Sequence, residues 1–285
     1  MTMNLTQQIR DRAHDLLQSG TVSCFIAWEP ARFEHWRTPV TIESPDEVDR
    51  IVVDEWCDQL IAKYALQRRG DGRIGMVARG CESRAVERLV ADRQISRQDV
   101  YLVGVGCTGM LDRDGGAPLK KCEECQRRNP VTYDEMVGET VEEPRPYRFG
   151  EVDRIEAMEP EQRRAFFDRM FSQCAMCFAC RNVCPACNCR SCFADAERVG
   201  WLEKDFGLDA SRYWGLMRAF HTGDRCIECG ECERACPMGL PLMTLMHKQV
   251  RDIDRLFGPY EGGGLSDAGP DPLRSYRTDD VEEFM

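Results

Sequence analysis

Residues 174–192 read CAMCFACRNVCPACNCRSC, and residues 226–239 read CIECGECERACPMG. Each stretch contains the pattern Cys-x2-Cys-x2-Cys-x3-Cys-Pro, which is typical of bacterial ferredoxins with two [4Fe–4S] clusters. In such ferredoxins the first three thiolates ligate one cluster and the fourth ligates the other. The predicted ligands are Cys174, Cys177, Cys180 and Cys236 for one cluster, and Cys226, Cys229, Cys232 and Cys184 for the second.

Zinc is the alternative for these cysteines, but it usually takes two pairs of ligands and does not need the third spacing or the trailing proline. Three further cysteines, Cys187, Cys189 and Cys192, follow the first motif directly. They indicate either a possible additional cluster with a fourth ligand from elsewhere, or thiols that shield the neighbouring cluster. One of them could also replace Cys184 as a ligand.

The chain has 285 residues, 17 cysteines and a formal net charge of −11. A secreted disulfide scaffold would be shorter and would carry an apolar leader, so we expect cysteines that bind metal in a cytoplasmic protein. We expect no membrane span, because no apolar run is long enough. The acidic balance disfavours nucleic acid and favours a basic protein partner.

Apolar runs at 22–28, 73–78 and 99–105 predict short buried strands, with helices expected at 5–18 and 82–93. Strand, helix and strand in succession indicate a βαβ unit with parallel strands. A capping pattern at Ser44-Pro45-Asp46-Glu47 predicts a further helix that continues to about Leu66.

The predicted fold class is α+β or α/β, with a small N-terminal α/β domain and a C-terminal ferredoxin-like domain whose two [4Fe–4S] clusters are embedded in helices. Helices are expected near 160–172, 210–220 and 242–256. The predicted divisions are a domain at 1–128, a linker or arm at 129–158, the two-cluster domain at 159–261 and an acidic tail at 262–285.

Cys81 and Cys107 each follow a predicted strand, where open α/β sheets form their crevices. Cys122 and Cys125 form a Cys-x-x-Cys pair that can fold over the same crevice. Four converging cysteines suit a third [4Fe–4S] cluster or a structural zinc, and the cluster agrees with the rest of the chain. Glycines at 104, 106 and 109 match a dinucleotide fingerprint only weakly, because a turn follows them in place of a helix.

Cys24 and Cys57 are isolated, and we expect them to be small buried side chains. The four histidines form no paired pattern, so we expect solvated or core side chains rather than ligands.

Several stretches resemble the iron–sulfur beta-type subunits of hydrogenases and formate dehydrogenases, which are related to the deazaflavin-reducing hydrogenase and dehydrogenase beta subunits. They are RGCESRAVERL at 79–89, VGVGCTGM at 103–110, KCEEC at 121–125 and the two cysteine-rich motifs. Similar subunits occur with heterodisulfide-reductase-like complexes. The resemblance implies electron relay to catalytic or flavin subunits, and some relatives bind flavin in the α/β domain.

The sequence therefore predicts a non-catalytic electron-transfer subunit of an oxidoreductase complex, with no catalytic residue assigned. Two alternatives remain open. The chain could be a flavin-dependent reductase that uses its N-terminal domain, or it could be a zinc or iron–sulfur module with a structural or sensing role.

Overall fold

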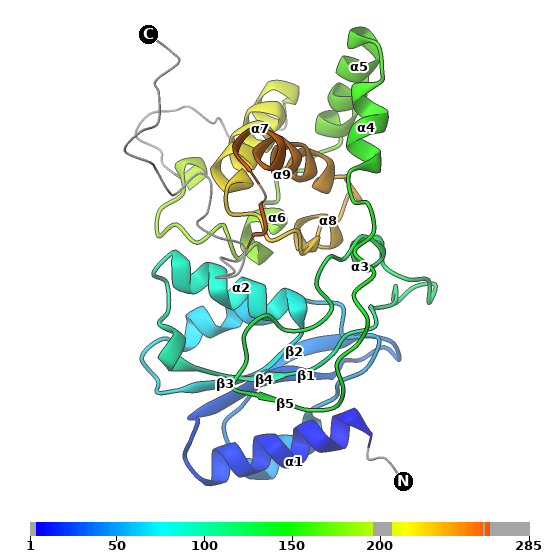
Figure 1. The fold of residues 1–285 in the computed structure, drawn as a ribbon. Helices are drawn as coiled ribbons and strands as arrows, with labels where there is room; N and C mark the ends of the chain where they lie inside the picture. The colour runs from blue at the N-terminus through cyan, green and yellow to red at the C-terminus, as the bar shows by residue number, and fades with distance from the viewer. Residues whose placement is uncertain (1–3, 196–206, 259, 263–285) are drawn as a thin grey trace.

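The structure is a computed structural model that describes residues 4–195, 207–258 and 260–262. Figure 1 shows a sheet with a helix on each face and a group of C-terminal helices beyond one of them. The acidic tail predicted at 262–285 lies outside the described residues except for Gly262.

Five strands form one sheet in the order β2-β1-β3-β4-β5. Their bounds are β1 Cys24–Pro30, β2 Arg37–Ile42, β3 Ile74–Ala78, β4 Val100–Gly104 and β5 Glu135–Met136. β1, β3, β4 and β5 run parallel, and β2 pairs with β1 in the antiparallel sense. The mixed α/β class with mostly parallel strands is therefore confirmed, whereas the sequence patterns do not predict β2 or β5.

α1 (Leu5–Gln18) and α2 (Gly80–Ala91) cover opposite faces of the sheet (Figure 1). The side chain of Asn4 caps α1 by accepting a hydrogen bond from the Thr6 amide at 3.1 Å. Since both faces are covered, β3 is buried along its whole length, as parallel strands usually are. α2 begins two residues after β3, and this short connection places Cys81 at the carboxyl edge of the sheet.

The long helix predicted from Pro45 to about Leu66 is wrong. Two short 3-10 helices, η1 (Pro45–Arg50) and η2 (Ala62–Arg68), stand in its place. Ile51 has an extended backbone, and the Val52 amide donates to the Trp28 carbonyl at 2.8 Å. Val52 thus bridges to Trp28 of β1, and the neighbouring Ile51 is buried. The apolar residues of this segment are therefore buried by extended chain beside the sheet and not by one face of a helix.

Residues 129–158, predicted as a linker or arm, contain β5 and lie against the sheet. The Asn129 side-chain amide donates to the Val141 carbonyl at 2.7 Å, which closes this segment into a loop. α4 (Gly150–Glu156) follows, and Glu156 forms ion pairs with Lys248 and Arg251. The domain boundary in this part of the chain stays a prediction.

The remaining helices are short or lie in the cysteine-rich half. They are η3 Arg97–Asp99, α3 Lys120–Glu123, α5 Pro160–Ser172, α6 Ala179–Val183, η4 Phe193–Asp195, α7 Leu208–Gly223, α8 Glu231–Arg234 and α9 Met243–Phe257. α7 packs between α5 and α9, and α6 packs on α8. The helices expected near 160–172, 210–220 and 242–256 are confirmed as α5, α7 and α9. None of the helices in the described ranges is both long and apolar enough to cross a bilayer.

Candidate iron–sulfur sites

The two cysteine motifs share an uncommon backbone conformation. Met176 and Phe178 flank the central Cys177 of the first motif with φ of 49° and 59°. Glu228 and Gly230 occupy the same positions in the second motif with φ of 55° and 69°. Left-handed non-glycine residues are strained, and alternating backbone of this kind turns amide groups inward to form concavities that hold anions and iron–sulfur groups.

Cysteines from the two motifs mix in space. One cavity, here named the first crossed cavity, is lined by Cys174, Cys177, Cys180 and Cys236. A second crossed cavity is lined by Cys184, Cys226, Cys229 and Cys232. α6 carries the first motif's third cysteine and packs on α8 of the second motif. The fourth cysteine of each motif therefore lines the cavity formed by the first three cysteines of the other motif. These groups match the two sets predicted from spacing, and the ligation itself stays a prediction.

A third cavity, the N-terminal cavity, lies at the carboxyl edge of the sheet and is lined by Cys81, Cys107, Cys122 and Cys125. Cys107 follows β4, and the 120–125 turn brings Cys122 opposite it. The Met110 amide lies 3.3 Å from the Cys122 sulfur and donates to it. The structure therefore brings together the four cysteines predicted to share a site, from three separate segments of chain.

Positive side chains compensate for thiolate charge in the N-terminal cavity. Burial raises the pKa of Cys81, Cys107 and Cys125 above the ordinary thiol value, so the free thiols are neutral. Five basic side chains also line the cavity, namely Arg79, Arg84, Lys121, Arg127 and Arg128. A bound metal group would displace the thiol protons, and these cations would then face thiolates.

The spacing of the thiols bears on the size of the group they could hold. In the described part of the chain, no three His, Cys, Asp or Glu side chains converge closely enough to hold a single metal ion. The cysteines instead stand around cavities. A [4Fe–4S] cluster and a structural zinc both use four cysteine ligands, and the choice between them at these cavities stays a prediction.

The cavities share walls. Ile227 and Cys229 line both the N-terminal cavity and the second crossed cavity. Arg218 and Met246 line both crossed cavities. The three four-cysteine sites are therefore neighbours in a row, with the second crossed cavity in the middle.

Arg218 is a residue that the cysteine spacing does not reveal. It lies on α7, is 5% exposed, and its Nε has no hydrogen-bond partner within the described residues. Its Nη2 donates to the Cys180 carbonyl at 3.1 Å. An unpaired buried guanidinium nitrogen is costly, and neighbouring thiolates would stabilise it. The sequence signal is that Arg218 shares the buried stripe of α7 with Ser211, Trp214 and Thr222.

A network of buried ion pairs joins α3 to α8. Lys121 pairs with Glu231, whose side chain is 2% exposed, and Arg234 lies 3.0 Å from the same carboxylate. Burial raises the pKa of Glu231, but Lys121 and Arg234 lower it further, to about 2. The Asp58 carboxylate forms ion pairs with the guanidinium groups of Arg113, at 2.5 Å, and Arg234, at 3.6 Å. These contacts fix the N-terminal cavity against the second crossed cavity.

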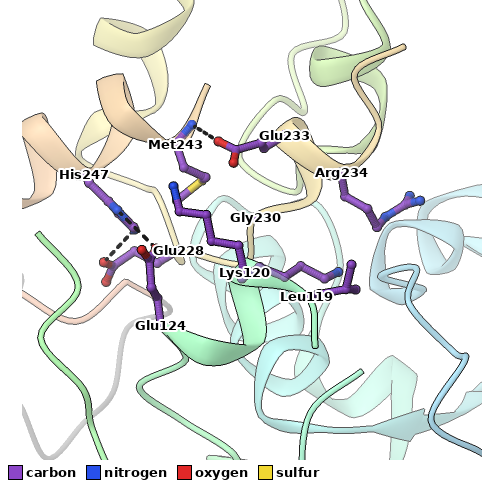
Figure 2. A pocket seen from close by; sticks show the side chains of 10 residues that line it. Leu119, Lys120, Glu124, Glu228, Gly230, Glu233, Arg234, Met243 and His247 are labelled. Carbon is purple, nitrogen blue, oxygen red and sulfur yellow. Dashed lines mark hydrogen bonds and ion pairs between the residues drawn. The ribbon is translucent and has the colours of Figure 1, made fainter. Parts of the chain in front are cut away.

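Beside this network, a polar pocket opens between α3, α8 and α9 (Figure 2). His247 points into it, with Nε2 3.6 Å from Glu228 and Nδ1 3.9 Å from Glu124. Burial lowers the pKa of His247 to about 4, so the imidazole is neutral near pH 7. Glu233 accepts a hydrogen bond from the Met243 amide at 2.9 Å, which fixes the start of α9.

The remaining cysteines behave in two ways. Cys24 and Cys57 are 3% and 1% exposed inside the sheet core, as predicted, and burial raises the pKa of Cys57 to about 12. Cys187, Cys189 and Cys192 line a fourth cavity, here named the side cavity, which shares Arg218 with both crossed cavities.

A comparison with models of protein families gives no match. The chain is similar to the F420-dependent formate dehydrogenase subunit beta of Methanocaldococcus jannaschii, with 21% identity over 302 aligned positions. The matched region covers 72% of this chain and 76% of that protein. The relationship is therefore distant, but it extends over most of both chains.

Proposed function

We propose that the chain is an electron-transfer subunit of an oxidoreductase complex related to formate dehydrogenase. The distant relative is named as a beta subunit of an F420-dependent formate dehydrogenase, which supports the role of an oxidoreductase subunit. The finer proposal, a relay through clusters, depends on one observation. Three groups of four cysteines line cavities that share walls in a row.

In this proposal Cys81, Cys107, Cys122 and Cys125 hold one cluster, and the cysteines of the two crossed cavities hold two others. When bound, [4Fe–4S] clusters store and pass single electrons, over a range of potentials that their surroundings set. The residues of this chain supply the thiolates, compensate their charge with Arg218 and Lys121, and fix the spacing through shared walls. Catalytic or flavin-bearing partner subunits would supply the site for two-electron chemistry.

The first test is metal content. Anaerobically purified protein should contain about 12 irons with matching sulfide at these three sites. Cys236→Ala should disturb the cluster of Cys174, Cys177 and Cys180, while Cys24→Ala, a matched change at a buried cysteine outside the cavities, should leave iron unchanged. One zinc per four cysteines, without sulfide, would contradict the proposal.

The second test is turnover. The isolated chain should accept electrons from dyes but show no turnover with formate, hydrogen or nicotinamide cofactors. Sustained reduction of a natural substrate at roughly 1 per second or more would contradict a pure relay. Bound flavin accompanying that activity would favour the alternative of an independent reductase.

A further inference from the structure

The side cavity contains a fourth side chain with a metal-binding atom. Cys187, Cys189 and Cys192 line it together with His221 from the last turn of α7. The His221 ring contacts the edge of Phe193, with ring centroids 4.9 Å apart at 79°. It makes no hydrogen bond or ion pair with a side chain in the ranges that the structure describes, so its ring nitrogens are available there.

The loop that carries these cysteines is held in place by the N-terminal half. Lys63 Nζ donates to the carbonyls of Cys187 at 2.9 Å and Arg181 at 3.1 Å. The Asn188 side-chain amide donates to Asp92 at 2.8 Å. The three cysteines therefore stand on a fixed backbone, as the ligands of a metal centre must.

Three guanidinium groups also line the side cavity, from Arg181, Arg218 and Arg225. Arg181 is paired with Asp195 at 2.8 Å, and Arg225 with Asp92 at 3.4 Å. Arg218 is buried, and its Nε has no hydrogen-bond partner among the residues that the structure describes. These guanidinium groups would face the thiolates of a bound cluster and offset part of its negative charge.

The division of cysteines between cavities separates this site from its neighbour. Cys184 lines the second crossed cavity and Cys187 lines the side cavity, and the two side chains are hydrogen-bonded to each other where these cavities meet. Cys184 thus completes the predicted set of the second crossed cavity. Ligation of the second crossed cavity by Cys187 in place of Cys184 stays an alternative prediction, since the two thiols are in contact.

We propose that Cys187, Cys189, Cys192 and His221 hold a further [4Fe–4S] cluster, ligated by three thiolates and one imidazole. This inference extends the proposed relay. Cys189 and His221 are both exposed, so this cluster lies at the surface and is the one that a redox partner can approach. A neutral imidazole in place of a thiolate makes the centre less negative and raises its reduction potential, as histidine does in Rieske centres.

The test uses the anaerobically purified full chain. Cys189→Ala should lose about four irons and leave the signals of the other clusters intact. Pulsed EPR of the reduced wild type should show nitrogen coupling from one directly bound imidazole. His221→Cys should keep its iron, lose that coupling and lower the midpoint potential of one cluster. The expected shift is at least a tenfold change in the reduced-to-oxidised ratio, which corresponds to about 59 mV.

His14→Cys, at a partly exposed position of α1 that lines none of the four cavities, is the matched control and should change neither iron nor coupling. Unchanged iron in Cys189→Ala would overturn the cluster, and absent nitrogen coupling in the wild type would overturn the histidine ligand. About 12 irons in the wild type, insensitive to Cys189→Ala, would reject this site while leaving the relay intact. Absence of iron at the other twelve cysteines would instead reject the relay.

Discussion

Glu231→Gln should weaken the ion pairs that hold α3, at the N-terminal cavity, against α8, at the second crossed cavity. The carboxylate is 2% exposed and receives Lys121 from α3 and Arg234 from α8. Glutamine has nearly the same shape, so packing is preserved while the charge is removed. The glutamine oxygen could still accept a hydrogen bond, but Lys121 would lose its carboxylate partner and keep the Asp58 carbonyl, and Arg234 would keep the Asp58 carboxylate at 3.6 Å.

Two estimates of the cost agree. Removing one partner of a buried ion pair typically costs about 3–5 kcal/mol, because the remaining charge stays buried. Separately, Lys121 and Arg234 lower the pKa of Glu231 from the ordinary 4.5 to about 2 despite burial. That difference corresponds to about 3 kcal/mol of stabilisation near pH 7.

The assay is the rate of cluster loss in guanidinium under anaerobic conditions, followed by visible absorbance. If the lost interaction is absent from the unfolding transition state, about 3 kcal/mol accelerates the loss roughly 100-fold. Glu151→Gln is the matched control, since its ion pair with Arg154 has side chains 28% and 52% exposed and should contribute less than about 1 kcal/mol. Equal rates for the two variants would refute the reasoning.

Three further predictions concern single positions. Gly80→Ala should lower iron at the N-terminal cavity, because its Cβ would lie 2.0 Å from the Arg127 carbonyl; Gly150→Ala, with open space around it, should not, and equal iron in both would contradict this. Arg218→Met should lower the midpoint potentials of both crossed-cavity clusters by at least about 59 mV in EPR-monitored titrations, since a buried cation is removed, whereas Arg218→Lys should largely restore them. Stabilisation by Glu156, whose hydrogen bonds to two cations of α9 lower its pKa to about 2, should be present above pH 4.5 and lost as the pH falls towards 2. Since Glu156 is 36% exposed, the effect should be less than about 1 kcal/mol in thermal unfolding, and Glu156→Gln should abolish it.

The elements that could be predicted from the sequence are those whose own residues carry an apolar run or a helical spacing of apolar residues. β3 and β4 are apolar runs between polar segments, and α9 has an apolar stripe at helical spacing. β2 escapes prediction because Pro39 interrupts it, and proline is tolerated there only because β2 is an edge strand. β5 has two residues, and its pairing with β4 depends on tertiary contact rather than on pattern.

The residues of the candidate sites also fall into two groups, those predictable from local spacing and those placed by tertiary packing. Spacing alone predicts which cysteines belong together, because ligand geometry is encoded locally in each motif. Spacing cannot predict that Arg218 lies at the wall of three cavities or that His221 faces a cysteine triad. Both residues lie on α7, in the segment between the two cysteine motifs, and the packing of α7 against the loops places them at these cavities.

The second cysteine motif is also part of the N-terminal core. Ile227, between two predicted ligands, is 2% exposed and belongs to the same hydrophobic cluster as the sheet, and Cys229 packs against that cluster. Domains joined by a small polar interface usually move relative to each other, whereas a core residue shared by both halves resists such motion. Electron transfer weakens steeply with distance, so a row of sites requires constant spacing. Ile227 lies in the wall of two cavities, so the fold holds these cavities at a fixed spacing, and the proposed relay would need no domain movement between the two halves of the chain.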